Sequence, residues 1–192
     1  CIRDSFSPEL VQAVPEQMDG PWYISCDYGT VNPTSMGLWG PKGGVWYRTA
    51  EFYYDSRKTG RQQTDGEYAD DLARLAGGQD IRGVVLDPSA ASFREELLRR
   101  GWTVYRAENE VLSGIRRTAE LLRAGQLVIC TPCEDAIREF GLYRWDTAAS
   151  GDRVVKEHDH AMDDIRYFAV TVAGRRREGF FAGTVERGGE MA

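Results

Sequence analysis

Short runs of apolar, aromatic and β-branched residues, separated by glycine and proline, dominate the chain from residue 22 to residue 54. Gly40-Pro41-Lys42-Gly43-Gly44 interrupts them with residues that favour turns. Such runs between turn signals are typical of β-strands joined in hairpins. We therefore expect three strands in an antiparallel meander, over residues 22–27, 35–39 and 45–54, with a turn over residues 40–44.

The following residues alternate between helical spacing and short apolar runs. Tyr68, Leu72 and Leu75 recur at the spacing of one helix face, and Val84-Val85-Leu86 is wholly apolar, as in a strand buried on both faces. This pattern predicts an α/β fold with a mixed central sheet flanked by helices. We expect helices over residues 68–75, 89–101, 111–122, 135–143 and 159–173, and strands over residues 84–87, 103–105 and 127–130.

Two terminal segments lack this periodicity. Residues 1–20 contain two prolines and no periodic apolar pattern, so we interpret them as a linker or arm. Residues 175–192 are charged and rich in glycine apart from Phe180-Phe181, and we interpret them as a C-terminal tail. The predicted organisation is one folded domain over residues 21–174.

Composition narrows the class of protein. The chain has 192 residues, 42% of them apolar, which suffices for a substantial core in one domain. It shows no run near the roughly 18 apolar residues of a membrane span and no signal-peptide pattern. We therefore expect no membrane partner and reduced, intracellular cysteines. The net charge is −6 and 21 of the 24 basic residues are arginine, which we interpret chiefly as codon usage.

Three acidic positions follow or lie within buried elements. Asp27 ends the first strand and Asp87 ends the wholly apolar one, so each carboxylate is poorly solvated and needs a partner. If these strands are neighbours, Mg²⁺ or Mn²⁺ would relieve the repulsion of the two like charges. Asp163 or Asp164 on the last helix would complete a site for two ions, suited to phosphodiester cleavage. Each aspartate alone is more simply a turn or cap residue, but the combination favours a metal site.

His160 precedes Asp163 by three residues and Asp164 by four, so it shares a helix face with them. A histidine beside a carboxylate cluster can ligate a metal or move a proton. The simpler interpretation, a solvated residue at a helix start, suits His158 better than His160.

Cys130-Thr131-Pro132-Cys133 has the spacing of a redox motif or of half a zinc site. Cys1 and Cys26 stand alone and cannot complete a zinc site, and the motif comes late for a thioredoxin-like fold. We therefore assign it neither function.

Basic residues gather in two places. An arginine-rich stretch over residues 94–123 is interleaved with glutamates, and a predicted hairpin around Ser150-Gly151-Asp152 carries basic and aromatic side chains. Such groups suit contact with phosphates. The candidates for DNA binding are Arg116, Arg117, Arg144, Arg153 and Lys156.

The motifs together resemble the nuclease domain of the large terminase subunit of tailed bacteriophages. The segments that carry the resemblance are Asp27-Tyr28-Gly29, Val84-Val85-Leu86-Asp87-Pro88-Ser89 and His158-Asp159-His160-Ala161-Met162-Asp163-Asp164-Ile165-Arg166-Tyr167. The likeness runs from about residue 22 to residue 173, and residues 137–145 are similar to the family's helix before its hairpin. It implies an RNase H-like fold and a metal-dependent endodeoxyribonuclease that cuts concatemeric viral double-stranded DNA during genome packaging.

The resemblance also implies roles for single residues. Asp27, Asp87 and Asp163 would be catalytic and bind two Mg²⁺ or Mn²⁺ ions, with His160 beside them. A small apolar residue is more usual where this chain has Asp164, so Asp163 and Asp164 both remain candidate metal ligands, and the His-x-x-Asp spacing favours Asp163. Lys156 and Asp159 would contact the metal ligands without binding the ions themselves.

Partners follow from the same resemblance: an ATPase motor in the full-length protein, the small terminase subunit and the portal, in the cytoplasm of the infected bacterial host. No G-x-x-x-x-G-K-[ST] phosphate loop occurs in the sequence, so we expect no ATP hydrolysis by this chain. Residues 1–20 would then lead from the motor, and the tail would contact the portal. Two alternatives stay open: another RNase H-like enzyme, such as a junction resolvase or transposase core, and a non-catalytic docking module.

Overall fold

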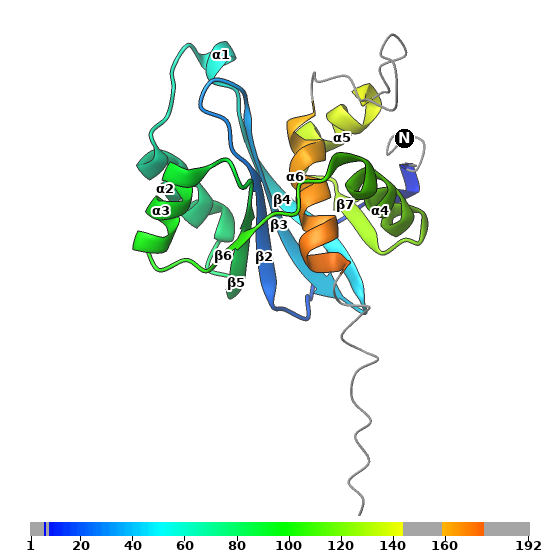
Figure 1. The fold of residues 1–192 in the computed structure, drawn as a ribbon. Coiled ribbons are helices and arrows are strands. Elements are labelled where there is room, and N and C mark those ends of the chain that lie inside the picture. Colours follow the sequence, from blue (N-terminus) through cyan, green and yellow to red (C-terminus); the bar gives the residue numbers. More distant parts are fainter. Residues whose placement is uncertain (1–5, 7, 144–158, 175–192) are drawn as a thin grey trace, which may run out of the picture.

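A seven-stranded sheet forms the centre of the structure, a computed structural model that describes residues 6, 8–143 and 159–174 (Figure 1). The strands are β1 (Val11–Gln12), β2 (Trp22–Asp27), β3 (Thr34–Lys42), β4 (Val45–Tyr54), β5 (Ile81–Leu86), β6 (Val104–Arg106) and β7 (Leu127–Cys130). Their order is β1-β7-β4-β3-β2-β5-β6. β2, β3 and β4 pair antiparallel and the remaining pairs are parallel, so the predicted mixed sheet is confirmed.

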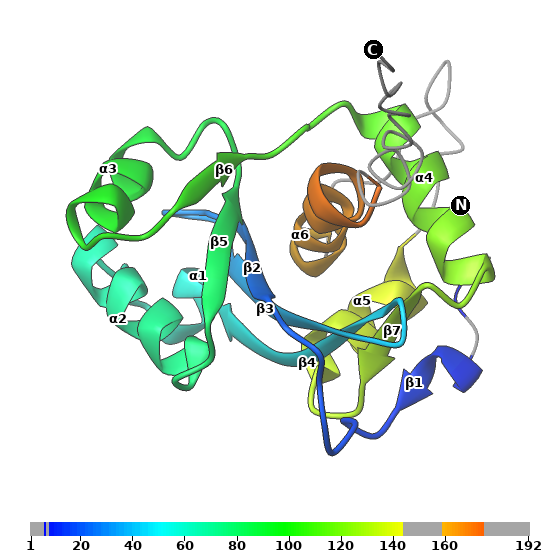
Figure 2. The same cartoon turned by 90° about the horizontal axis from the view of Figure 1, so that it is seen from below.

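Helices cover both faces of the sheet, as Figure 2 shows. They are α1 (Ser56–Thr59), α2 (Asp65–Ala76), α3 (Ala91–Arg99), α4 (Val111–Arg123), α5 (Glu134–Leu142) and α6 (His160–Phe168), with a 3₁₀ turn η2 (Pro8–Leu10) and a π-helical turn η3 (Ala169–Ala173) after α6. One core lies between the sheet and α2 and α3, and a second lies around α4, α5 and α6. Among the described residues, no helix is both long and apolar enough to cross a bilayer.

Alternation along the strands decides what faces α6. Cys26 is buried in the core under α2 and α3, whereas Ser25 contacts α6 and Asp27 lines a cleft beside it. Successive side chains of a strand point to opposite faces of the sheet, so Asp27 shares the face of Ser25. Val85 of the neighbouring strand β5 and Asp87, which directly follows β5, obey the same rule, and both contact the α6 side. Two strand-end aspartates are thus directed to one side of the sheet.

The turn between β3 and β4 is shorter than predicted. β3 pairs with β4 as far as Lys42, opposite Val45, and only Gly43 and Gly44 form the turn. Both have positive φ, 58° and 86°, which a two-residue type I′ hairpin turn requires. Pro41 is tolerated within β3 because β2 pairs with β3 only as far as Trp39, so no ladder bond to β2 is lost there.

Three short elements, η2, β1 and α1, have no counterpart in the sequence prediction. η2 and β1 lie within residues 1–20, and β1 pairs in parallel with β7, so part of the segment interpreted as a linker joins the sheet. The division into linker, domain and tail stays a prediction, and residues 175–192 lie outside the described residues.

Candidate active site

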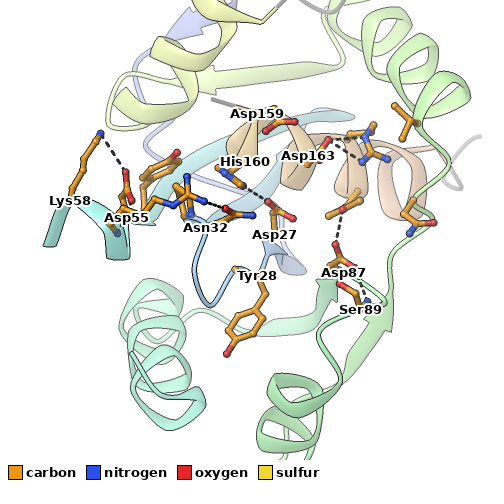
Figure 3. Close-up of a pocket in the computed structure, with 18 residues that line it drawn as sticks. Asp27, Tyr28, Asn32, Asp55, Lys58, Asp87, Ser89, Asp159, His160 and Asp163 are labelled. Carbon is orange, nitrogen blue, oxygen red and sulfur yellow. Dashed lines mark hydrogen bonds and ion pairs between the residues drawn. The ribbon is translucent and has the colours of Figure 1, made fainter. Parts of the chain in front are cut away.

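A cleft of about 650 Å³ opens where β2 and β5 end beside the start of α6 (Figure 3). It combines four of the predicted site residues, Asp27, Asp87, His160 and Asp163, and also contains Asp159. Its other polar lining comes from the β2–β3 loop, from α1 and its N-cap, from the segments after β5 and β6, and from α6. Among these residues are Asn32, Asp55, Arg57, Lys58, Ser89, Asn109, Arg166 and Tyr167.

Strand pairing brings Asp27 and Asp87 together. β2 and β5 are parallel neighbours with Cys26 opposite Leu86, so the next residue of each strand leaves the sheet at the same edge. The backbone N–H of Asp87 also donates to the carbonyl of Cys26 at 3.3 Å. The expected juxtaposition of the two aspartates is present.

Asp87 is held by two donors. Its Oδ1 accepts from the backbone N–H of Ser89 at 2.7 Å, and its Oδ2 accepts from the hydroxyl of Tyr167 at 2.9 Å. Burial, with nearby carboxylates, raises the pKa of Tyr167, so this hydroxyl stays a donor. Asp87 does not cap α3, whose N-cap residue is Ala90 without a side-chain hydrogen bond. The capping interpretation therefore does not explain Asp87.

Asp163 is held from within its own helix. Its Oδ1 accepts from Nε and Nη2 of Arg166 at 3.2 and 3.0 Å, and the Arg166 side chain is 2% exposed. Because these residues are three apart on α6, they lie on one helix face. The arginine fixes Asp163 toward the cleft.

His160 contacts Asp27 directly, with 2.9 Å between His160 Nδ1 and Asp27 Oδ2. Burial raises the pKa of Asp27 to about 7, although His160 opposes this rise, and the carboxylates of Asp163 and Asp164 add to it. Burial lowers the pKa of His160, but the hydrogen bond and charge of Asp27, with the charges of Asp159 and Glu139, raise that pKa overall. A carboxylate that is buried near like charges gains strongly from a nearby cation.

The structure separates Asp164 from the cleft. Its side chain is fully buried on the sheet side of α6 and accepts from Ser25 Oγ at 2.8 Å, from Ser35 Oγ and from both Nη atoms of Arg48. Consecutive helix residues point about 100° apart, which explains why Asp163 and Asp164 face different surroundings. The geometry does not support Asp164 as a metal ligand.

Arg48 is the charged partner of Asp164 and is itself fully buried. A Cβ on Gly37 would overlap the guanidinium of Arg48, so the guanidinium fills the space that this glycine leaves. Arg48 also pairs with Glu51 at 3.3 Å, and Glu51 accepts from the first backbone N–H groups of α5. One buried network therefore links β3, β4, α5 and α6.

Glu139 holds the N-terminal end of α6. It is fully buried, accepts from Tyr53 at 2.7 Å and accepts from the backbone N–H of Ala161 at 2.7 Å. A carboxylate at a helix N-terminus satisfies an otherwise unpaired donor and the helix dipole. Glu139 thus sets where α6 begins, immediately beside His160.

The donor chemistry of the cleft fits a hard divalent cation, because Asp27, Asp87 and Asp163 offer carboxylate oxygens. Within the described part of the chain, no three His, Cys, Asp or Glu side chains already surround a common point suited to an ion. The carboxylates are instead held by His160, Tyr167 and Arg166. Each carboxylate has about four lone-pair positions, so these bonds leave capacity for an ion.

Two of the predicted DNA-binding residues, Arg116 and Arg117, lie in the described part of the chain, and neither lines the cleft. Arg116 is exposed on α4, and Arg117 of the same helix pairs with Glu120 at 3.1 Å. Arg144, Arg153 and Lys156, with the predicted hairpin and His158, lie outside the described residues. The DNA-binding role of these residues stays a prediction.

The two cysteines of the CxxC motif are buried. Burial raises the pKa of Cys130 to about 11 and that of Cys133 to about 12, and Cys133 Sγ donates to the carbonyl of Arg48 at 3.2 Å. Thiols held in the neutral form are poor nucleophiles and poor metal ligands. Their surroundings are those of core residues.

Sequence reasoning missed Arg48, Glu139 and the cations of α1. Residues 137–145 and Tyr167 belong to the segments that resemble the family, but nothing local marks Glu139 as a helix cap. Arg57 and Lys58 follow the third strand after an intervening Asp55-Ser56 pair. That position, at the same sheet edge as Asp27, is the one signal that could have identified the rim of the cleft.

No protein-family model matches the chain, and no curated protein matches it by sequence. Among solved structures, a large terminase from a thermophilic bacteriophage, solved in complex with ADP, is 41% identical over 89% of this chain, with a TM-score of 0.85. This chain spans 44% of that protein. The P22 large terminase nuclease domain is 18% identical, covering 89% of this chain and 90% of its own, with a TM-score of 0.69.

A third match is the large terminase nuclease from the thermophilic phage G20c, solved with bound magnesium. It is 16% identical over 85% of this chain and 94% of its own, with a TM-score of 0.63. A TM-score of this size over most of both chains shows that the two share a fold. The resemblance indicated by the sequence motifs is thus confirmed: this chain has the RNase H-like fold of the large terminase nuclease domains of bacteriophages.

Proposed function

We propose that this chain is a metal-dependent endonuclease domain that cuts viral double-stranded DNA during genome packaging. The observation that carries the proposal is the convergence of Asp27, Asp87 and Asp163 from β2, β5 and α6 on one cleft. The similar fold of the G20c nuclease, solved with bound magnesium, supports it.

Asp27, Asp87 and Asp163 would hold two divalent ions, Mg²⁺ or Mn²⁺. Such ions activate a water for attack on the phosphodiester and stabilise the leaving oxygen. Asp27 has the central place in this proposal, because β2 lies between β3 and β5 in the sheet.

The neighbouring side chains have their own tasks. Tyr167 and the backbone of Ser89 orient Asp87, and Arg166 orients Asp163. His160 holds a proton at Nδ1 toward Asp27 Oδ2 and so limits the cost of burying that carboxylate. In this proposal Asp164 positions α6 through Arg48 and binds no ion.

The larger assembly is also part of the proposal. The large terminase that was solved in complex with ADP is more than twice as long as the region that this chain matches. Since the present sequence has no phosphate loop, we assign ATP hydrolysis to an attached motor domain. The small terminase subunit and the portal are the further partners that we propose.

Substrate preference separates this function from its rivals. With Mg²⁺ or Mn²⁺, we expect the cleavage rates of linear duplex DNA and of a four-way junction with the same arms to agree within about threefold. The reason is that the proposed contacts are to backbone phosphates, which both substrates present. The measurement is a gel assay with equal concentrations of the two substrates. A strong preference for the junction would favour a resolvase, and absence of cleavage of both would favour a docking module.

A further inference from the structure

Most of the arginines that the structure describes form ion pairs with carboxylates. Of the 14 arginines in the described residues, nine form ion pairs. The other five are Arg57, Arg82, Arg106, Arg116 and Arg123, and only Arg57 lines the cleft. Within the described part of the chain, Arg57 is therefore the one cleft arginine whose charge no carboxylate balances.

The partner of Arg57 is an uncharged amide. Arg57 Nη2 donates to Asn32 Oδ1 at 2.6 Å, which directs the guanidinium without cancelling its charge. Lys58 lies next to it on α1, with a side chain that is 68% exposed and 3.8 Å from Asp55 Oδ2. Because the ammonium is mostly solvated at that separation, the pair contributes little, although the Asp55 side chain is only 16% exposed. The ammonium group therefore stays available to another anion. We call Asn32, Arg57 and Lys58 the α1 rim.

Local contacts hold the α1 rim in place. Asp55 caps α1 by accepting from the backbone N–H of Arg57 at 3.1 Å, and Ser56 Oγ donates to the carbonyl of Val31 at 3.0 Å. Together with the bond from Arg57 to Asn32, these contacts tie α1 to the β2–β3 loop. Arg57 and Lys58 thus project from a turn that hydrogen bonds hold in place. Less conformational entropy is therefore lost when these side chains bind a ligand.

We propose that the α1 rim binds a backbone phosphate of the DNA beside the carboxylates of the cleft. The inference rests on the proposed function, because it takes DNA as the substrate. Asp27, Asp87, Asp159 and Asp163 make the cleft repel phosphates, and the rim supplies positive charge on one side of it. Arginine forms bidentate bonds with phosphate, and such contacts position DNA without reading its sequence.

The test compares Arg57→Gln/Lys58→Gln with the control Arg94→Gln/Arg99→Gln. The control removes the same charge from exposed side chains on α3 that do not line the cleft. Binding of a fluorescent duplex is measured by anisotropy in Ca²⁺, from about 50 to about 300 mM salt. The rim variant should bind about tenfold more weakly, with a slope of log K against log salt that is smaller by about 1 to 2. The control should change less than about twofold.

Equal weakening in the two variants would overturn the inference, because net charge alone would then explain it. Unchanged binding by the rim variant, or no binding by the wild type, would overturn it too. Cleavage in Mg²⁺ and Mn²⁺ is scored separately for the same proteins. If the rim variant binds more weakly than the wild type but the wild type never cleaves, only the proposed function is contradicted. If the wild type cleaves and the rim variant binds as tightly as the wild type, only the rim inference is contradicted.

Discussion

Replacing Asp164 by leucine should lower the free energy of unfolding by about 3–5 kcal/mol, the usual cost of breaking a buried ion pair. The side chains of Asp164 and Arg48 are both fully buried, and two of the donors to Asp164 come from the guanidinium of Arg48. The variant leaves that guanidinium charged and without its main partner. Glu51, at 3.3 Å, balances only part of the charge.

The double variant Arg48→Met/Asp164→Leu is the matched control. It replaces the pair by apolar side chains, which is often neutral for stability when the volumes are similar. We expect it to recover most of the stability that Asp164→Leu loses, as measured by urea unfolding of the three proteins. A loss below about 1 kcal/mol in the single variant, or a double variant that is no more stable, would contradict this account.

Asp27→Asn should reduce DNA cleavage by at least about 100-fold. Removal of a residue that only hydrogen-bonds a metal ligand costs up to about 100-fold, and Asp27 is proposed as a ligand itself. The amide removes the negative charge that a divalent cation requires while keeping the shape of the side chain. Asp27 pairs with His160 and lines the cleft, and its removal relieves a buried carboxylate. The fold should therefore persist, which unfolding curves will show.

Asp70→Asn is the control for this substitution. It makes the same chemical change at an exposed aspartate of α2 that pairs with Arg100 outside the cleft. Initial rates of plasmid nicking in Mn²⁺ should separate the two variants clearly. Cleavage by Asp27→Asn within about threefold of wild type, or an equal loss in Asp70→Asn, would show that Asp27 has no special role.

The meeting of Asp27 and Asp87 could be predicted because it depends on short-range rules. Each aspartate ends an apolar run, and a parallel pair of strands places both ends at one edge of the sheet. Period-two alternation then directs both side chains to the same face. The fold class followed from the order of the same runs.

The His-x-x-Asp spacing favoured Asp163, but the sequence alone left Asp164 open as a second candidate ligand. Arg48, which holds Asp164 away from the cleft, lies 116 positions away from it on a strand where a lone arginine carries no local signal. The space for Arg48 depends in turn on Gly37 of the neighbouring strand. Such a set is visible only after the sheet has assembled beneath α6.

The α1 rim was missed for a related reason. Arg57 and Lys58 look like part of a charged connection, and charged residues in loops are usually solvated. Their relevance comes from the hydrogen bond to Asn32, which joins two loops that the sequence separates by 25 residues. The arginine-rich stretch over residues 94–123 contains more basic residues, but four of its seven arginines pair with acids.

The central claim is that the cleft carboxylates act through divalent cations, and metal depletion with add-back tests it most directly. Supercoiled plasmid is incubated with the wild-type chain in chelator, and then with excess Mg²⁺ or Mn²⁺ restored. We predict no nicking in chelator, and nicked followed by linear plasmid once either ion is added. Cleavage that persists in chelator, or a failure of both ions to support it in folded protein, would contradict the account.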